Sequence, residues 1–378
     1  MSVAHKLVRA WFVGLSLAII FCLLSADKLN AQDMQSITDA QGRTIEIPAD
    51  VERVICSGPG ALRLLTYLQG QDLVVAVDSL EKRDAVQEAR PYAVANPQYQ
   101  EYPLFGEFRG RDNPELIADL EPQPQVILRT YPESGHDPDQ VQQKTGVPVL
   151  TLEYGNLTFA REDLDQSLRI MGQILGLEER AEEVIQFFDK LQNDLKERTA
   201  DIPAEERPGT YIGGVAYRGP HGFRSTEPAY APFEFVGALN VSSELASQER
   251  ASSHATVAKE KILFWDPEII FVDVSSLRLD QGTNALDQLR QDPAYQSLSA
   301  VEQGRIHGVF PYNSYTQNFE AVFANAYYIG KVLYPEQFRD VDPLQKAEEI
   351  SEFLNGAPAF EQINSRLEQQ AFNRIELQ

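Results

Sequence analysis

Two stretches of the chain, NPELIADLEPQPQVIL at 113–128 and AKEKILFWDPEIIF at 258–271, repeat one pattern. Each has a Glu near the start of a short helix with apolar periodicity, then an acid–proline pair, then an apolar run. Proline stops a helix because it has no N–H to donate and forces the preceding residue into an extended conformation. Short apolar runs between such breakers are typical of buried parallel strands. The repeated helix–proline–strand unit therefore predicts two similar α/β lobes.

A long helical segment separates the two units. Residues 159–200 contain no proline and place apolar side chains at helical spacing. An unbroken helix of this length would reach ~60 Å, and Gly172 and Gly176 are the points where it can bend or break. We therefore expect an N-terminal lobe at 37–158, a connecting helix at 159–200 and a C-terminal lobe at 208–378.

The composition is that of an acidic globular protein. The 378 residues are 43% hydrophobic and carry a formal net charge of −23. Phosphate binding needs a basic surface, so this charge argues against a nucleic-acid partner. Once the first 31 residues are removed, only Cys56 remains, and we expect it to be a small buried side chain at a strand end.

The first 31 residues have the features of a cleaved export signal. Basic residues precede an apolar run at 11–24, which is shorter than the ~20 residues that a membrane-spanning helix needs. Cleavage is expected after Ala26 or Ala31. A lipid anchor on Cys22 is not expected, because a lipobox needs a small residue where this chain has Phe21.

Polar and aromatic residues follow several of the expected strands, such as those at 51–56, 126–129 and 210–215. Open α/β sheets bind ligands at the carboxyl ends of their strands. Guanidinium groups match carboxylates, Tyr rings stack on ligands, and glycine turns expose backbone N–H groups to anions. A tight turn or an ordinary surface position is the alternative role for each residue. The candidate ligand-binding residues are Ser57, Gly58, Arg109, Arg129, Tyr131, Tyr154, Tyr217, Arg218, His221, Arg224, Tyr312 and Tyr315.

Signatures of catalysis are absent from the sequence. It has no nucleophile elbow, zinc-protease, P-loop or dinucleotide-binding motif. Outside the first 31 residues, His136, His221, His254 and His307 are scattered without metal-ligand spacing, so the sequence predicts no metal site.

Three features together resemble the substrate-binding proteins of ABC importers for iron–siderophore complexes, haem and cobalamin. They are TDAQGRTIEIPADVERVI at 38–55, the helices that carry Glu115 and Glu260, and FPYNSYTQN at 310–318. The resemblance covers roughly residues 37–335. The chain departs from the family at PQPQ, residues 122–125, where one proline and an acid are usual.

The resemblance implies two Rossmann-like lobes joined by one rigid helix, with the ligand held in the cleft between them. It implies a monomeric periplasmic protein that is not an enzyme and needs no cofactor of its own. It also implies that Glu115 and Glu260 dock into arginine pockets of a permease dimer in the inner membrane. The alternative for each Glu is an acid favoured by the dipole of its helix.

The expected function is capture of an iron(III) complex, such as a siderophore-like chelate, and its delivery to the permease. Cobalamin binding would rely mainly on apolar contacts, and several Arg residues argue against it. Haem binding would need an axial ligand, for which Tyr131, His221 and Tyr312 are candidates. An exported chelatase-like enzyme is the alternative of another class, with His221 and Glu227 as its local acid–base pair.

Overall fold

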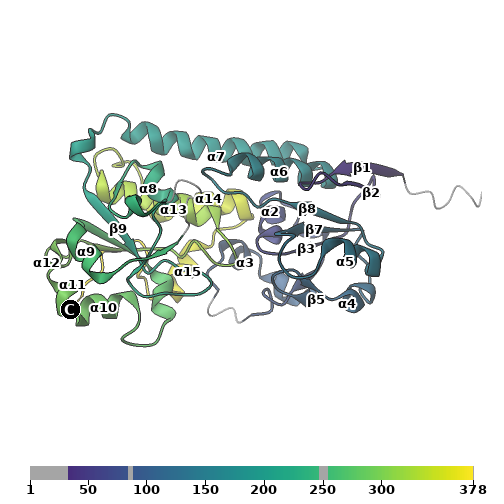
Figure 1. Ribbon diagram of the computed structural model, residues 1–378. Coiled ribbons are helices and arrows are strands. Elements are labelled where there is room, and N and C mark those ends of the chain that lie inside the picture. The colour runs from purple at the N-terminus through teal and green to yellow at the C-terminus, as the bar shows by residue number, and fades with distance from the viewer. Residues whose placement is uncertain (1–32, 84–87, 247–253, 378) are drawn as a thin grey trace, which may run out of the picture.

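The computed structural model describes residues 33–83, 88–246 and 254–377. It shows two α/β lobes side by side, bridged along one edge by a long helix (Figure 1). The N-terminal sheet has the order β6-β5-β4-β3-β7-β8 and is parallel except for β6, which pairs antiparallel with β5. Its strands are β3 (Val54–Ser57), β4 (Val74–Asp78), β5 (Leu104–Glu107), β6 (Arg111–Asp112), β7 (Val126–Thr130) and β8 (Val149–Leu152).

A hairpin and four short helices complete the N-terminal lobe. The hairpin is formed by β1 (Met34–Thr38), which pairs antiparallel with β2 (Thr44–Pro48). Cys56 is buried and unpaired at the end of β3, as expected. The helices are α2 (Ala61–Tyr67), α3 (Pro91–Ala95), α4 (Pro114–Ala118) and α5 (Pro138–Thr145).

The C-terminal lobe is built on a parallel sheet of four strands in the order β11-β9-β13-β14. These are β9 (Gly209–Gly213), β11 (Leu239–Asn240), β13 (Ile269–Asp273) and β14 (Ile306–Val309), with β10 (Ser225–Thr226) and β12 (Ala255–Thr256) forming a separate small ribbon. Helices of this lobe are α8 (Ala231–Phe235), α9 (Lys259–Trp265), α10 (Ala285–Gln291), α11 (Pro293–Gln296), α12 (Ser299–Glu302) and α13 (Phe319–Leu333). The two lobes expected from the repeated unit are thus confirmed.

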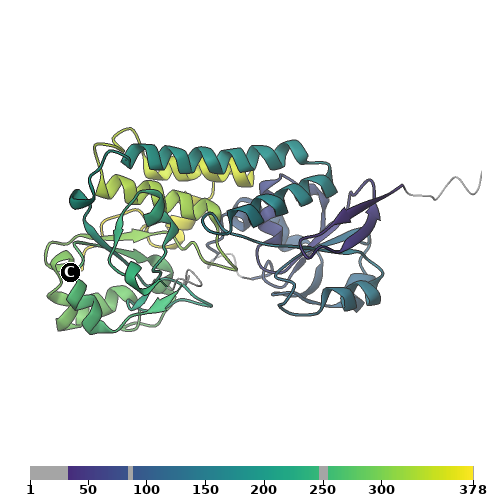
Figure 2. The same ribbon diagram turned by 45° about the horizontal axis from the view of Figure 1, so that its top comes forward.

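The connecting segment is two helices rather than the single helix expected at 159–200. The first, α6 (Arg161–Leu175), ends at Gly176, which adopts a left-handed conformation with φ of 66°. The second, α7 (Glu178–Thr199), runs along the top of both lobes (Figure 2). The break occurs at one of the two glycines singled out in the sequence, because glycine enters this conformation without a Cβ clash.

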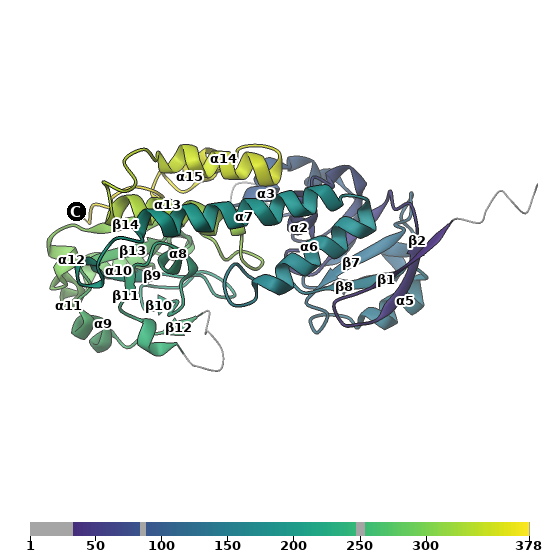
Figure 3. The ribbon, with the colours of Figure 1, turned by 90° about the horizontal axis from the view of Figure 1, so that it is seen from above.

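Two helices near the end of the chain pack against the N-terminal lobe. After α13, helix α14 (Pro343–Asn355) contacts α2 and α3, and helix α15 (Phe360–Arg366) contacts α3 (Figure 3). One hydrophobic cluster runs from Leu64 on α2 through Phe188 on α7 to Phe323 on α13. The lobes therefore share a core along one edge, and 208–378 is not a spatially separate unit.

The expected export signal at 1–31 lies outside the described residues. Among the helices that are described, none is long and apolar enough to cross a membrane.

Candidate functional site

The candidate site begins at two loops that follow β5 and β7 at the carboxyl end of the N-terminal sheet. The backbones of these loops pack directly on one another, since the His136 N–H donates to the carbonyl oxygen of Gly110 at 2.8 Å. A Cβ on Gly135, which has φ of 79°, would lie 2.2 Å from that same oxygen. Glycine is required at this position by both its conformation and the close approach.

Arg129, at the end of β7, is fully buried and fixes both loops in place. Its guanidinium donates to the carbonyl oxygens of Gly110, Ser134 and His136, and it forms an ion pair with Asp112 at 2.6 Å. Burial raises the pKa of Asp112, and the charge of Arg129 opposes that rise. The prediction that Arg129 contacts ligand is therefore corrected, because the side chain is fully buried and both terminal nitrogens of its guanidinium donate to groups inside the lobe.

Ser57 and Gly58 belong to the same buried support. The Ser57 hydroxyl donates to Asp112 at 2.5 Å and accepts from Arg129 at 2.8 Å. Gly58 has φ of 88°, and a Cβ there would lie 2.3 Å from the carbonyl oxygen of Thr130. Close packing therefore accounts for the glycine at this turn. The prediction that Ser57 and Gly58 form an open anion site is corrected, because their surroundings are filled by other residues of the lobe.

One pocket of about 460 Å³ collects cationic side chains from both lobes. Arg109, Arg111 and His136 line it from the N-terminal lobe, and Arg218 lines it from the C-terminal lobe. Within residues 33–83, 88–246 and 254–377, none of these three guanidinium groups forms an ion pair. Unpaired guanidinium groups that converge in this way can bind an anion through charge-assisted hydrogen bonds.

The backbone is strained at both ends of this pocket. Arg109 has φ of 62° and Arg218 has φ of 56°, conformations that a non-glycine residue adopts at a cost of about 1–3 kcal/mol. Arg109 lies over the ring of Phe108 at 5.2 Å, and Arg218 lies over the ring of Tyr217 at 5.4 Å. Such strain is concentrated at ligand sites in other proteins.

The loop between β14 and α13 reaches from the C-terminal lobe to the N-terminal lobe. The Tyr315 hydroxyl donates to Asp78 at 2.8 Å and accepts from the backbone N–H of Arg109 at 2.7 Å. The hydroxyls of Tyr131 and Thr316 form a hydrogen bond of 2.8 Å. Burial and the neighbouring Glu81 raise the pKa of Asp78 to about 7. Two predicted ligand contacts, Tyr131 and Tyr315, therefore link the lobes.

Arg63, which the sequence reasoning missed, anchors the same loop. It is fully buried on α2 and donates to the carbonyl oxygens of Ser314 at 3.0 Å and Gln317 at 2.8 Å. It also donates to the Tyr154 hydroxyl at 2.6 Å, which in turn donates to Gln317. Tyr154 is thus corrected from a ligand contact to a lobe-to-lobe link. The sequence did contain a signal for this residue, because Arg63 is the one charged residue in the apolar run ALRLLTYL at 61–68.

Two further predicted contacts lie outside the cationic pocket. Tyr312 is buried against the ring of Tyr230 at 5.5 Å. Arg224 is exposed and donates to the carbonyl oxygen of Val257 at 2.6 Å. Neither side chain lines the pocket that Arg218 shares with the other lobe.

The loop after β9 brings together residues that are distant in sequence. The Tyr217 ring stacks on His254 at 4.5 Å, and the ring centres of His221 and His254 lie 5.4 Å apart. Tyr217 and His221 lie in the same loop as Arg218, and neither lines the cationic pocket. His254 was not predicted, because it is 33 positions from His221 (254 − 221) and no spacing rule relates them.

Arg111 and His136 are the remaining functional candidates that were missed. Arg111 was visible in the segment EFRGR, but only Arg109 was selected from it. His136 lies in the loop after β7, at the expected sheet edge. Their proximity depends on the packing of two loops, which the sequence alone does not reveal.

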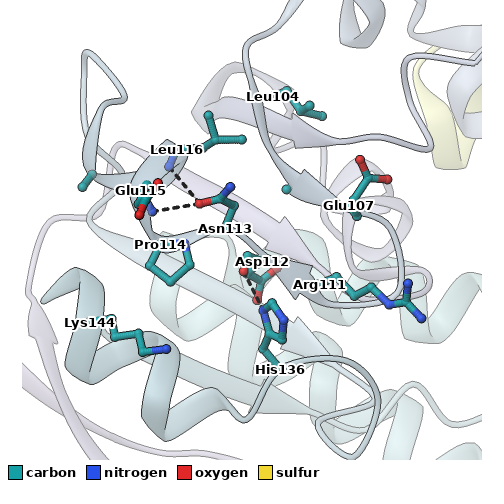
Figure 4. A pocket seen from close by; sticks show the side chains of 12 residues that line it. Leu104, Glu107, Arg111, Asp112, Asn113, Pro114, Glu115, Leu116, His136 and Lys144 are labelled. Carbon is teal, nitrogen blue, oxygen red and sulfur yellow. Dashed lines mark hydrogen bonds between the residues drawn. The ribbon is translucent and has the colours of Figure 1, made fainter.

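A second hollow of about 860 Å³ surrounds α4 on the surface of the N-terminal lobe (Figure 4). Glu115 is exposed in the first turn of α4, where the Asn113 side chain accepts from its backbone N–H. Leu116 is also exposed. Arg111 and His136 line both this hollow and the cationic pocket. The predicted docking residue therefore lies next to the candidate ligand site.

Glu260 occupies the matching position in the other lobe. It is exposed in the first turn of α9, as Glu115 is in α4. Its neighbours Lys259 and Lys261 are paired with Asp292 and Glu244. Both acids are thus available at the surface, each at the start of a short helix.

Comparison with known proteins agrees with this architecture. Residues 54–309 match the family described as periplasmic binding protein. The molybdate-binding protein MolA of Haemophilus influenzae is 23% identical over 347 residues, covering 86% of this chain and 92% of MolA. The Fe(3+)-citrate-binding protein YfmC of Bacillus subtilis is 22% identical over 281 residues, covering 74% of this chain and 79% of YfmC.

Solved structures share the fold at low sequence identity. A periplasmic solute binding protein from Veillonella parvula superposes with a TM-score of 0.67 at 18% identity, covering 90% of this chain and 99% of that one. The family match extends over more than half of the chain, in the region that holds both sheets. The chain belongs to the periplasmic binding protein family, and it is a binding protein rather than an enzyme.

Proposed function

We propose that this protein captures a compact anionic iron(III) complex between its lobes and delivers it to a membrane permease. The observation that carries the proposal is the pocket in which Arg109, Arg111 and Arg218 converge without carboxylate partners among the described residues. The formal charge of the chain is −23, so unpaired cations gathered in one place are unusual for it. They would offset the desolvation of an anionic ligand.

The size of the pocket favours a small complex. A volume of about 460 Å³ lies in the lower part of the usual range for ligand pockets, about 300–1,000 Å³. The relative that binds Fe(3+)-citrate, by its name, supports a carboxylate chelate of iron. Haem is less favoured as the ligand, because Tyr131 is bonded to Thr316 and Tyr312 is buried.

A second candidate ligand is a tetrahedral oxyanion. The relative named as molybdate-binding matches this chain over 86% of its length. An oxyanion and an anionic chelate would use the same guanidinium groups, so the choice between them rests on direct binding measurements.

Ligand binding is tested by titrating the purified protein, with its tyrosine and tryptophan fluorescence as readout. The panel contains ferric citrate, ferric hydroxamate and catecholate complexes, molybdate, haem and cobalamin. Arg109→Ala and Arg218→Ala should each weaken binding of the preferred anion roughly 10-fold, since a charge-assisted hydrogen bond contributes about 1.5–3 kcal/mol.

The matched control is Arg169→Ala, which removes an exposed arginine that is already paired with Glu182 on the connecting helices. It should leave affinity unchanged. Binding of haem or cobalamin alone, insensitive to both pocket substitutions, would contradict the proposal. Preference for molybdate over every ferric complex would select the oxyanion instead.

Docking is assigned to Glu115 and Glu260, because both are exposed at the start of short helices on separate lobes. The double charge reversal Glu115→Lys and Glu260→Lys should abolish uptake in cells while ligand affinity stays within about twofold. Reversal of Glu121 and Glu268, two other exposed acids, serves as the control. Uptake that survives the first double variant, or is lost equally in the second, would refute the docking assignment.

A further inference from the structure

The hydrogen bonds of His221 fix its tautomer. Its Nε2 lies 2.7 Å from the carbonyl oxygen of Tyr217. A carbonyl oxygen only accepts hydrogen bonds, so Nε2 carries a proton, and in the neutral ring, the form that binds metal, Nδ1 holds the lone pair. Within the described parts of the chain, no hydrogen bond reaches this Nδ1.

The same reasoning applies to His254. Its Nε2 lies 2.9 Å from the Ser225 hydroxyl oxygen. That hydroxyl has a single proton, which it donates to the carbonyl oxygen of Val215 at 2.6 Å. The Ser225 oxygen must therefore accept from His254 Nε2–H, which leaves Nδ1 of His254 as a second lone pair. This Nδ1 also has no hydrogen-bond partner among the described residues.

The two imidazoles are close enough to bind one metal ion together. Their ring centres lie 5.4 Å apart, with the ring planes tilted by 39°. Metal–nitrogen bonds of about 2.0–2.1 Å in a tetrahedral site place the two ring centres roughly 5 Å apart.

We propose that His221 and His254 form a two-imidazole site that binds a transition-metal ion through their Nδ1 atoms. The backbone carbonyl of Tyr217 and the hydroxyl of Ser225 act as outer partners that orient the rings, as is common for histidine ligands. Two protein ligands leave the remaining coordination positions of the metal for the groups of a bound chelate.

This site adjoins the cationic pocket, so the inference rests on and deepens the proposed function. Arg218 lies over the Tyr217 ring, and that ring stacks on His254. An anionic chelate held by the arginines would thus have its metal within reach of the two imidazoles. The substrate class becomes an anionic metal complex with two adjacent coordination positions that are open or filled by water.

The first test uses Cu²⁺ alone, at one equivalent, on the full-length protein. Electron paramagnetic resonance should show two equivalent imidazole nitrogens, and competition with glycine gives the affinity. His221→Gln and His254→Gln should each remove the two-nitrogen signal and weaken binding at least 10-fold. Far-UV circular dichroism and the melting temperature establish that each variant is folded.

His307→Gln is the matched control, because His307 lies on β14 outside the cationic pocket and its Nδ1 is bonded to the Tyr328 hydroxyl. It should bind Cu²⁺ as the unmodified protein does. Equal affinity in all three variants, or a loss in His307→Gln alone, would overturn the proposal.

Ser225→Ala tests the outer partner separately. It keeps both imidazoles but removes the oxygen that accepts from His254, so Cu²⁺ affinity should fall roughly 10-fold with two nitrogens still bound. Unchanged affinity would overturn the role given to Ser225. Because Cu²⁺ alone does not need the arginines, these results stay separate from the proposed function, which the Arg109 and Arg218 variants test.

Discussion

At the scale of single residues, burial decides the role of each arginine. Arg129 lies at the end of β7 and Arg218 lies in the loop after β9, both at the carboxyl edge of a sheet. From the sequence, both are equally good candidates for contact with a ligand. The structure buries Arg129 completely and pairs it with Asp112, whereas Arg218 is exposed in the pocket. The same guanidinium chemistry therefore supports the loops in one case and faces the ligand in the other.

Replacing Arg129 by Met should lower the free energy of unfolding by about 3–5 kcal/mol, because it leaves the Asp112 carboxylate buried without its partner. Arg218→Ala should change it by less than about 0.5 kcal/mol. Urea denaturation of both variants at pH 7 measures the difference. Equal stabilities would show that the buried ion pair does not hold the loops.

Asp273 makes stability depend on pH. Burial raises its pKa to about 6, whereas an unfolded Asp titrates near about 3.9. Between these values the folded state binds more protons than the unfolded state, so the free energy of unfolding falls as the pH rises through this window.

Asp273→Asn removes this titration. The stability of this variant relative to the unmodified protein should therefore increase from pH 4 to pH 7, by up to about 3 kcal/mol. Urea denaturation at several pH values checks this, with the exposed Asp50→Asn as control. Parallel pH curves for all three proteins would contradict the assignment.

At the scale of elements, the break between α6 and α7 depends on one glycine. Gly176 has φ of 66°, and nothing lies within 4 Å of the position of a Cβ. A side chain at this position would therefore strain the backbone but would not clash with any neighbouring residue.

Gly176→Ala should accordingly lower the free energy of unfolding by about 1–2 kcal/mol, the cost of a left-handed conformation for a residue with a Cβ. Gly176→Asn should lose less, since asparagine tolerates this conformation better than alanine. Chemical denaturation of the two variants compares them. An alanine variant as stable as the parent would indicate that the helices join differently in solution.

At the scale of the whole molecule, several contacts hold the lobes together away from α7. Arg63 binds the loop after β14, Tyr315 binds Asp78, and the Tyr67 hydroxyl on α2 donates to Glu320 on α13. Helix α14 also packs on α2 and α3. These links are distributed along the interface, so large lobe movements would break buried hydrogen bonds.

The radius of gyration, measured by small-angle X-ray scattering, should therefore change by less than about 1 Å when ligand is added. The double variant Arg63→Met and Tyr315→Phe removes two of the contacts between the lobes, so the change in its radius of gyration on ligand addition should be larger. A large compaction in the unmodified protein would refute a largely preformed cleft.

The sequence by itself determined the elements and their order. Proline breakers, apolar periodicity and the repeated Glu–helix–Pro–strand unit are local properties, and the two lobes followed from them, whereas the connecting segment was expected as one helix and is two. Of the residues that the sequence proposed for ligand binding, Arg109 and Arg218 line the cationic pocket, each in a loop that follows a strand of its sheet.

Only the tertiary structure decided which of these side chains are buried. It turned Ser57, Arg129 and Tyr154 into internal supports and brought His254 beside His221. The physical reason is that burial and pairing depend on contacts between residues far apart in the chain. Local patterns carry no information about those contacts, so the cationic pocket and the imidazole pair appear only once the loops are packed.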